Sequence, residues 1–313
     1  MSTSSTNGSA VPPVTDGSVR DKVVVVTGAS SGLGFETAKQ LATQGTEVVM
    51  ICRSKGRGEQ ARAQIAEVAS GKPPTLLLAD LSVQADIRRV AEQVRKRYDR
   101  VDILINNAGG AHAERQLGAD GIEQTWATNH LAPFLLTELL LPLLSAAPAG
   151  RVVTVSSEIY SKKLDLENLQ GERNYSFFGA YRMSKLGNVL FTRELARRLA
   201  GSRVTAVAVS PGPAKTNFGG GGPGGVMGVL TGAMRRTPLF RPADEAAEGI
   251  VWAATAPELS GAPGGLYMRR KELKLKGAAA DAALADKLWH VSEAQIGIDP
   301  SKSSVAALAE QAA

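Results

Sequence analysis

The stretch Lys22-Val-Val-Val-Val-Thr-Gly-Ala-Ser-Ser-Gly-Leu-Gly34, close to the start of the 313-residue chain, decides the fold. Its first part, Lys22 to Val26, is an almost purely apolar and β-branched run, as a strand buried on both faces of a sheet requires. The segment after the glycines, 35–44, has the amphipathic spacing of a helix and is closed by Gly45. The stretch therefore predicts a strand, a tight glycine turn and a helix in direct succession.

The glycine turn has the composition of a phosphate-binding loop. Glycines let a ligand approach the backbone closely, and the free amides at the start of a helix attract a pyrophosphate. A tight turn without a ligand would also use glycines, but the position between a strand and a helix is the context that a dinucleotide site requires. The predicted contacts to the dinucleotide are Gly28, Ser30, Ser31, Gly32, Leu33 and Gly34.

From Asp21 onward, strand-like and helix-like segments alternate, which is the signature of parallel βαβ units. The further strands are expected at 47–52, 75–79, 102–105, 151–156, 203–210 and about 265–268, and the further helices at 58–69, 83–98, 121–144, 178–199, 242–255 and about 281–293. The predicted fold class is α/β: a single doubly wound (Rossmann) domain with a mainly parallel seven-stranded sheet. The domain is expected to span 19–294, between a disordered Ser/Thr/Gly/Pro-rich tail, 1–18, and a C-terminal tail, 295–313.

The end of the second strand indicates which dinucleotide binds. An acidic residue about 20 positions past the glycines holds the ribose 2′-hydroxyl of NAD, whereas an arginine accommodates a 2′-phosphate. This chain has Arg53 there, and no acid occurs from Val48 to Gly58. Although Arg53 could be a surface loop residue, the missing acid and the present cation both favour NADP(H). Asp80 and Leu81 follow the third strand, where Asp80 could contact the adenine or cap the next helix.

Tyr181 and Lys185 are four residues apart in the helix expected at 178–199, so both side chains lie on one face. A phenol titrates near ~10 in water, and a neighbouring cation stabilises its anion and lowers that pKa. The pair is therefore a candidate acid/base unit. Taken alone, the same pattern also fits a solvated helix face.

Several motifs in one order resemble those of the short-chain dehydrogenase/reductase family. They are Thr27 to Gly34, Asn106-Asn-Ala-Gly109, Ser157 and Tyr181-x-x-x-Lys185, and the resemblance spans about 21–289. The stretches 151–157, 169–175 and 184–195 further resemble the retinol-dehydrogenase-like branch. The resemblance implies hydride transfer between a nicotinamide and a carbonyl or alcohol carbon.

The resemblance also implies a role for individual residues. Ser157, rather than the neighbouring Ser156, would hydrogen-bond the substrate oxygen, and Tyr181 would donate a proton to it. Lys185 would lower the pKa of Tyr181 and bind the nicotinamide ribose. Asn129 would hold a proton-relay water, although a structural role in a helix bend is equally consistent with the sequence. The remaining cofactor contacts that the resemblance implies are Asn107, Ala108, Gly109, Tyr181, Lys185, Pro211, Gly212 and Thr216.

The substrate pocket is expected to be apolar. Ser157 and Tyr181 are separated by an insertion, and the pocket walls predicted from it are Ile159, Tyr160, Phe177 and Phe178. A glycine-rich segment, about 214–241, contains Met227, Leu230 and Met234 and is interpreted as a flexible substrate lid, with a disordered surface loop as the alternative. These features predict a hydrophobic or aromatic ketone or aldehyde as the substrate.

Composition argues against several other classes of protein. The net charge of +6 comes from scattered basic residues, and the one cluster, Arg269-Arg270-Lys271, lacks interleaved aromatics and reads as a solvated strand end or loop, so no nucleic-acid partner is expected. The longest apolar run, 131–144, is too short and too interrupted to predict a membrane span. The three histidines lack metal-ligand spacing, so no metal is expected. A single cysteine, Cys52, fits a reducing compartment, and a cytoplasmic location is expected.

The function predicted from the sequence is an NADP(H)-dependent ketone or aldehyde reductase that also oxidises the matching alcohol. Two alternatives stay open: an epimerase or dehydratase on the same fold, which would recycle its cofactor within one turnover, and a catalytically silent NADP(H)-binding regulator. A monomer and a homo-oligomer are equally compatible with the sequence. Stoichiometric consumption of NADPH distinguishes the reductase from both alternatives.

Overall fold

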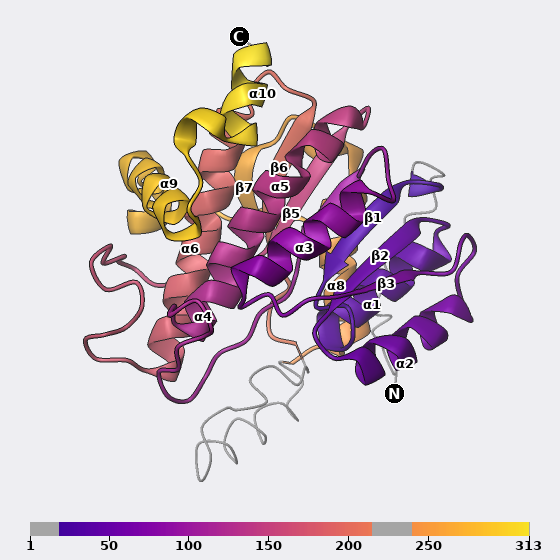
Figure 1. Ribbon diagram of the computed structural model, residues 1–313, viewed down its shortest axis with the longest axis horizontal. Helices are drawn as coiled ribbons and strands as arrows, with labels where there is room; N and C mark the ends of the chain where they lie inside the picture. The colour runs from indigo at the N-terminus through magenta and orange to yellow at the C-terminus, as the bar shows by residue number, and fades with distance from the viewer. Residues whose placement is uncertain (1–18, 215–239, 313) are drawn as a thin grey trace, which may run out of the picture.

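The computed structural model describes residues 19–214 and 240–312, and in this part of the chain an eight-stranded sheet forms the centre of the fold (Figure 1). The strand order is β3-β2-β1-β4-β5-β6-β7-β8, and β1 to β7 are parallel. The strands are β1 (Val23–Thr27), β2 (Glu47–Cys52), β3 (Thr75–Leu78), β4 (Ile103–Asn106), β5 (Gly150–Val155), β6 (Val204–Ser210), β7 (Pro263–Met268) and β8 (Lys271–Glu272). The predicted doubly wound α/β domain is confirmed.

The sheet has one strand more than the seven predicted. Strand β8 runs antiparallel to β7, with Met268 paired to Lys271. The intervening Arg269 and Arg270 both adopt positive φ, 50° and 63°, which makes the tight reversal of a two-residue hairpin. Such turns normally use glycine, asparagine or aspartate, so two arginines carry no sequence signal for a hairpin. The basic cluster is therefore an exposed turn and strand end, in agreement with its interpretation as a solvated strand end or loop.

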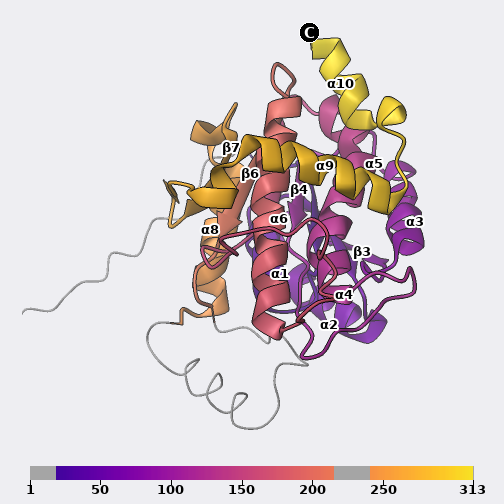
Figure 2. The same cartoon turned by 90° about the vertical axis from the view of Figure 1, so that its left-hand side faces the viewer.

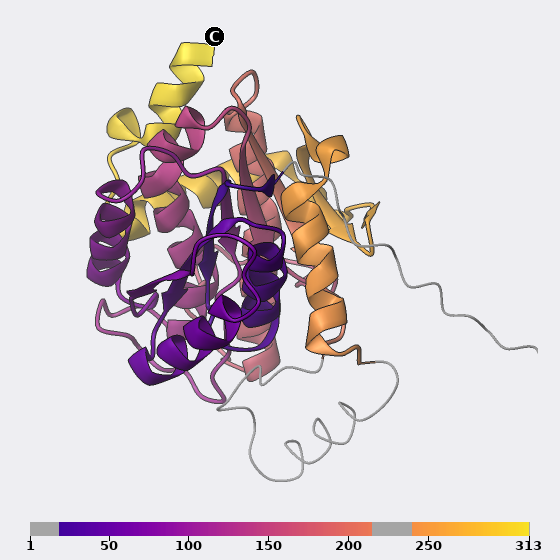
Figure 3. The same cartoon turned by 90° about the vertical axis from the view of Figure 1, so that its right-hand side faces the viewer.

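Helices cover both faces of the sheet (Figures 2 and 3). One face is covered by α1 (Gly32–Thr43), α2 (Lys55–Ala66) and α8 (Ala243–Thr255). The other is covered by α3 (Gln84–Arg95), α5 (Ala132–Ala146) and α6 (Phe177–Arg198), with α9 (Ala282–Ile296) lying across α6. Short elements complete the described chain: α4 (Gln124–Trp126), the π-helix η2 (Ala127–Leu131) and the 3₁₀ turns η3 (Pro257–Leu259), η4 (Gly277–Ala280) and η5 (Pro300–Lys302). The last helix is α10 (Ser304–Ala312).

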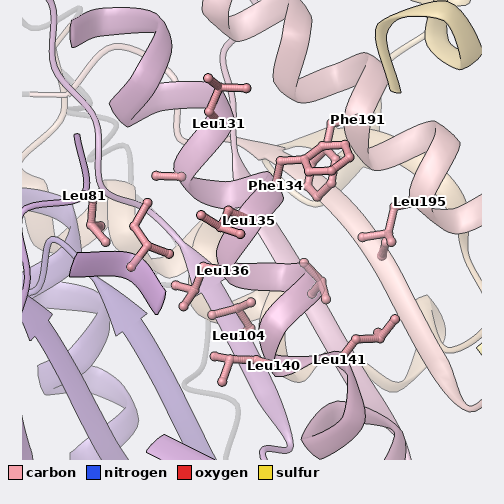
Figure 4. Close-up of a cluster of buried hydrophobic side chains, with 14 of the residues drawn as sticks. Leu81, Leu104, Leu131, Phe134, Leu135, Leu136, Leu140, Leu141, Phe191 and Leu195 are labelled. Atoms are coloured by element: carbon pink, nitrogen blue, oxygen red, sulfur yellow. The ribbon is translucent and has the colours of Figure 1, made fainter. Parts of the chain in front are cut away.

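The valine run of β1 contributes to the cores on both faces. Val23 and Val25 belong to the core beneath α3, α5 and α6, whereas Val24 and Val26 belong to the core beneath α1 and α8. Successive side chains of a strand point to opposite faces, so an uninterrupted apolar run is what a central strand needs. Figure 4 shows the first core, where leucines of α5 line the sheet and Phe134 meets Phe191 of α6. Each fully buried side chain of this size stabilises the fold by about 1.5–3 kcal/mol.

The single helix predicted at 121–144 is divided into α4, the π-helix η2 and α5. Glu123 begins it, because its carboxylate accepts hydrogen bonds from the backbone amides of Thr125 and Trp126. The stretch 124–146 is long and apolar enough to cross a membrane by length and composition, but 78% of its most apolar window is buried inside the fold. This burial is that of a core helix.

Ordered structure continues past residue 294. Helix α10 packs on α5, and the buried carboxylate of Glu138 on α5 accepts hydrogen bonds from the backbone amides of Ser304 and Val305. Those amides are among the first of α10, where a helix has donors without an internal partner. The segment assigned to a C-terminal tail thus contains a helix anchored to the core. The predicted N-terminal tail and nearly all of the predicted lid lie outside the described residues, although Ala214 and Arg241, near the two ends of the lid, pair with each other.

Candidate active site

The glycine turn after β1 brings the start of α1 against the strand end. Gly28 has a positive φ of 68°, and its amide donates to the Ile51 carbonyl of β2 at 2.9 Å. A Cβ at Gly34 would lie 2.4 Å from the Gly28 carbonyl oxygen, so no larger residue fits there without a backbone shift. The N-cap of α1, Ser31, makes no side-chain capping bond. The first amides of α1 are therefore oriented to bind an anion in front of the turn.

Thr27 joins this turn to the end of β4. Its hydroxyl oxygen accepts hydrogen bonds from the amides of Asn107 and Ala108, both at 2.9 Å. In return, the Asn107 side chain donates to the Thr27 carbonyl at 2.8 Å. The carboxyl ends of β1 and β4 are thus held together at the point where ligands bind in an open α/β sheet.

A cleft of about 570 Å³ runs along these strand ends. The residues predicted for the cofactor that line it are Gly28, Ser30, Ser31, Gly32, Leu33, Gly34, Arg53, Asp80, Leu81, Asn107, Ala108, Gly109, Tyr181, Lys185 and Pro211. Gly212, Ser157 and Asn129 lie outside this lining, and Thr216 lies outside the described residues. The structure therefore gathers into one cleft residues that the chain spreads from position 28 to position 211.

The cleft has two arginines at its β2 end. Arg53 follows β2, and Arg57 joins it from the first turns of α2. Arg57 was not among the predicted site residues, although it lies only four positions after Arg53 in a stretch without acids. The other residues of the lining that it missed are Ile51, Ala79, Gly110, Ala111, His112, Gln124, Thr128, Val155 and Ser156.

Asp80 does not cap the helix that follows it. Its carboxylate accepts hydrogen bonds from the amide and the hydroxyl of Ser82, at 2.9 and 2.7 Å, which forms a local turn. The N-cap position of α3 belongs to Val83, and the carboxylate of Asp120 binds the Gln84 amide from another loop. Asp80 is thus left on the cleft wall, and the capping alternative is wrong.

Helix α6 presents Tyr181 and Lys185 at the other end of the cleft. The Lys185 ammonium lies 5.7 Å from the centre of the Tyr181 ring and donates to the Val155 carbonyl at 2.8 Å. Ser156 donates its hydroxyl to the Lys185 carbonyl at 2.8 Å, so it ties β5 to α6. The next residue, Ser157, has its hydroxyl in a hydrogen bond with Tyr181. The two serines therefore have different partners: the Ser156 hydroxyl binds the α6 backbone, and the Ser157 hydroxyl binds the phenol.

Burial controls the ionisation of this pair. Desolvation raises the pKa of Tyr181, the hydrogen bond with Ser157 opposes the rise, and the nearby charge of Glu158 adds to it. Burial also lowers the pKa of Lys185 to about 8. Lys185 was expected to lower the pKa of Tyr181, but the net direction in the structure is upward, with desolvation as the largest cause. The reason is that both groups leave water, and desolvation disfavours the charged form of each.

Asn129 lies in the π-helix η2 and is completely buried. Its side-chain oxygen accepts a hydrogen bond from the Gly110 amide at 2.8 Å, and its side-chain nitrogen donates to the Gly110 carbonyl at 2.8 Å and to the Ser184 hydroxyl at 2.9 Å. Asn129 thereby ties the loop after β4 to α6. This is a structural role, but one between separate segments rather than in a helix bend, and the relay water stays a prediction.

The insertion between β5 and α6 leaves apolar side chains at the surface near Ser157 and Tyr181. Ile159 is 55% exposed and Phe178 51% exposed, and the rings of Phe177 and Phe178 meet edge to face at 5.1 Å. Tyr160, in contrast, packs against the hydrophobic core and is partly buried. None of these four predicted pocket walls belongs to the lining of the cleft, so the structure does not place them in it.

Comparison with known proteins identifies the family to which this chain belongs. The family described as short chain dehydrogenase matches residues 22–221 of the chain. The chain therefore belongs to the short-chain dehydrogenase family, and its curated relatives place it in the retinol-dehydrogenase-like branch. It is an oxidoreductase of the kind that uses a nicotinamide cofactor to interconvert an alcohol and a carbonyl group.

Two curated relatives and one solved structure show the extent of the similarity. "Retinol dehydrogenase 14" of Mus musculus is 36% identical over 300 residues, which cover 90% of this chain and 88% of the relative. "Putative daunorubicin C-13 ketoreductase DnrU" of Streptomyces sp. (strain C5) is 36% identical over 283 residues, covering 90% and 94%. A crystal structure of an uncharacterized protein from Mycobacterium paratuberculosis has a TM-score of 0.72 and 34% identity, covering 90% and 96%. The similarity thus extends over nearly the whole chain in each case.

Proposed function

We propose that this protein reduces a hydrophobic or aromatic ketone or aldehyde with NADPH and oxidises the matching alcohol in reverse. The observation that carries the proposal is the contact between Ser157 and Tyr181 beside Lys185, at one end of a cleft whose other end holds Arg53 and Arg57. This arrangement has a hydrogen-bond donor pair for a carbonyl oxygen at one end and two cations for a phosphate at the other.

The residues of the cleft fit NADP(H). The turn at Gly28 and Gly34 leaves no room for a Cβ but exposes backbone amides, which suits a pyrophosphate. Arg53 and Arg57 suit a 2′-phosphate, because arginine binds phosphate oxygens with two parallel hydrogen bonds. Lys185 would meet the nicotinamide ribose. When bound, the cofactor supplies the hydride.

The chain's own residues supply the proton. Because the pKa of Tyr181 is raised, its hydroxyl is protonated at neutral pH, which is the form that can donate to a substrate oxygen. Ser157 is already hydrogen-bonded to that hydroxyl and can hold the same oxygen beside it. Lys185 is 4% exposed, so its charge acts on the phenol and on developing negative charge with little screening by water.

The proposed substrate class rests on the exposed side chains of Ile159 and Phe178, together with the half-buried Phe177 that contacts Phe178. Burying apolar ligand area against an apolar surface contributes about 25 cal/mol of binding free energy for each Å². Such a surface therefore binds large apolar substrates better than small charged ones. The names of the relatives agree with this class, because they refer to retinol and to daunorubicin, an apolar alcohol and an aromatic ketone.

A screen of carbonyl compounds of graded size and charge tests the proposal, with NADPH oxidation followed by its absorbance. We expect stoichiometric NADPH consumption with bulky apolar or aromatic ketones and aldehydes. The Tyr181→Phe variant serves as the matched control, since it should bind NADPH without turning over. A preference for small anionic keto acids would contradict the substrate class, and product formation without net NADPH consumption would favour the epimerase or dehydratase. Cofactor binding without any turnover would favour the silent regulator.

A further inference from the structure

Glu158, the residue directly after Ser157, is hydrogen-bonded to the end of a neighbouring strand. Ser210 ends β6 and is 1% exposed, and its hydroxyl donates to the Glu158 carboxylate. The same hydroxyl oxygen accepts from the backbone amides of Glu158 and Gly212, both at 3.2 Å. One buried hydroxyl thus joins the segment after β5, the end of β6 and the Pro211-Gly212 turn, in the part of the fold where β5, β6 and α6 lie together (Figure 1).

These contacts hold the backbone of Ser157 from both sides. On one side Ser156 is bound to α6 through the Lys185 carbonyl, and on the other side Glu158 is bound to β6 through Ser210. The Ser157 hydroxyl also accepts from the Ile159 amide at 3.0 Å, which fixes its direction. A polar group that is held by several hydrogen bonds cannot rotate away from its partner without losing them.

Glu158 also places a negative charge near the phenol. Charged groups near Tyr181 include Lys185 on its own helix and Glu158 in the segment after β5. The Glu158 charge opposes ionisation of the phenol, in the same direction as burial. The carboxylate charge therefore acts on the Tyr181 hydroxyl through space. Its hydrogen bond to Ser210 acts on Ser157 through the backbone.

We propose that Glu158 is a positioning residue with two separable effects: its hydrogen bond to Ser210 orients Ser157 and the Pro211-Gly212 turn, and its carboxylate, one residue from Ser157, places a negative charge beside the proton-donating hydroxyl of Tyr181. The inference rests on the proposed function, because it assigns Glu158 to the reaction in which Tyr181 donates the proton. An acidic residue at this point thereby biases the enzyme towards carbonyl reduction near neutral pH.

Two variants separate the two effects. Glu158→Gln keeps an oxygen that can accept from Ser210 but removes the charge, so the pH at which reduction falls should move down by about 0.5–1 unit. The rising limb of alcohol oxidation should move down by the same amount, since oxidation needs the ionised phenol. Ser210→Ala keeps the charge but removes the shared hydroxyl, so the pH profile should stay in place while kcat falls and the KM for NADPH rises severalfold. Glu167→Gln, an exposed acid in the same insertion, is the matched control and should change neither.

The outcomes distinguish this inference from the proposed function. An unchanged pH profile in an active Glu158→Gln protein would overturn the electrostatic effect, and unchanged kcat and KM in Ser210→Ala would overturn the orienting effect. If Glu158→Gln fails to fold, Glu158→Asp, which keeps the charge with a shorter reach, should retain the native pH profile with altered KM, and a moved profile would count against the proposal. Titration of the Tyr181 phenolate by absorbance, taken as the difference from Tyr181→Phe, gives a readout that needs no substrate. The functional proposal itself would fail if the Tyr181→Phe variant turned over at the native rate. That outcome does not depend on the results for the Glu158 variants.

Discussion

The two ends of the cleft are built in different ways. At the cofactor end, the turn from Gly28 to Gly34 is a continuous piece of chain, and its shape follows from local backbone geometry. At the catalytic end, Ser157 and Tyr181 come from different elements, and Asn129, Ser156 and the buried Lys185 hold these elements in place. Local sequence therefore encodes the binding of the cofactor, whereas the chemistry depends on how distant segments pack.

The largest expected effect is at the catalytic end. Tyr181→Phe removes one hydroxyl without changing the shape of the side chain, and general acid catalysis is worth about 10²- to 10⁴-fold in rate. We expect kcat to fall by that factor while the Kd for NADPH stays close to the native value, as measured by steady-state kinetics and by cofactor fluorescence. Reduction at the native rate by this variant would show that the proton comes from another group.

The buried lysine predicts an unusual dependence of stability on pH. The pKa of Lys185 is about 8 in the folded protein and near ~10.5 when unfolded, so between these values the unfolded chain binds one more proton. The free energy of unfolding of the cofactor-free protein should therefore rise by up to about 3 kcal/mol as the pH increases from about 8 to about 10.5. Below pH 8 Lys185 is protonated in both states, so it should add no further pH dependence there. In Lys185→Met this contribution should vanish. Identical pH dependence of urea unfolding in the two proteins would contradict the assignment.

At the cofactor end, removal of an arginine should weaken the binding of NADPH. Arg53→Ala removes a charge-assisted contact worth about 1.5–3 kcal/mol, so NADPH should bind about 10- to 100-fold more weakly while NADH is unaffected. Arg62→Ala, on an exposed face of the neighbouring α2 and paired with Glu59, is the control and should change neither Kd. Equal dissociation constants for NADPH and NADH in the native protein would show that the 2′-phosphate is not recognised.

The smallest expected effect tests how the two strands are joined at the cofactor end. Thr27→Val deletes the hydroxyl that accepts hydrogen bonds from the amides of Asn107 and Ala108, and leaving these partly buried donors without that acceptor costs about 1–2 kcal/mol. We expect the free energy of unfolding to fall by this amount and the Kd for the cofactor to rise only slightly. Thr27→Ser retains the hydroxyl and should be close to native. If Thr27→Ser lost this stability while Thr27→Val stayed close to native, the methyl group rather than the hydroxyl would be responsible.

Strands and glycine turns were predictable from the sequence because their signals are local. The run of valines in β1 predicted a strand with two buried faces, the boundaries of β2 agree with the prediction residue for residue, and the spacing of Tyr181 and Lys185 was enough to place both on one face of α6. Periodicity and turn chemistry act over a few residues, so they can be read without knowledge of the rest of the chain.

Only the tertiary structure decided what depends on burial and on contacts between distant segments. The hairpin that adds β8 is made by two arginines with positive φ, and α10 becomes part of the core through Glu138 on α5. The direction of the Tyr181 pKa followed from desolvation, which no spacing along the chain reveals. The contact between Glu158 and Ser210 joins residues 52 positions apart, and its effect on Tyr181 exists because the ends of β5 and β6 are neighbours in the sheet. A sequence records which groups are present, but a charge or a hydroxyl acts through distance and dielectric environment, and the fold sets both.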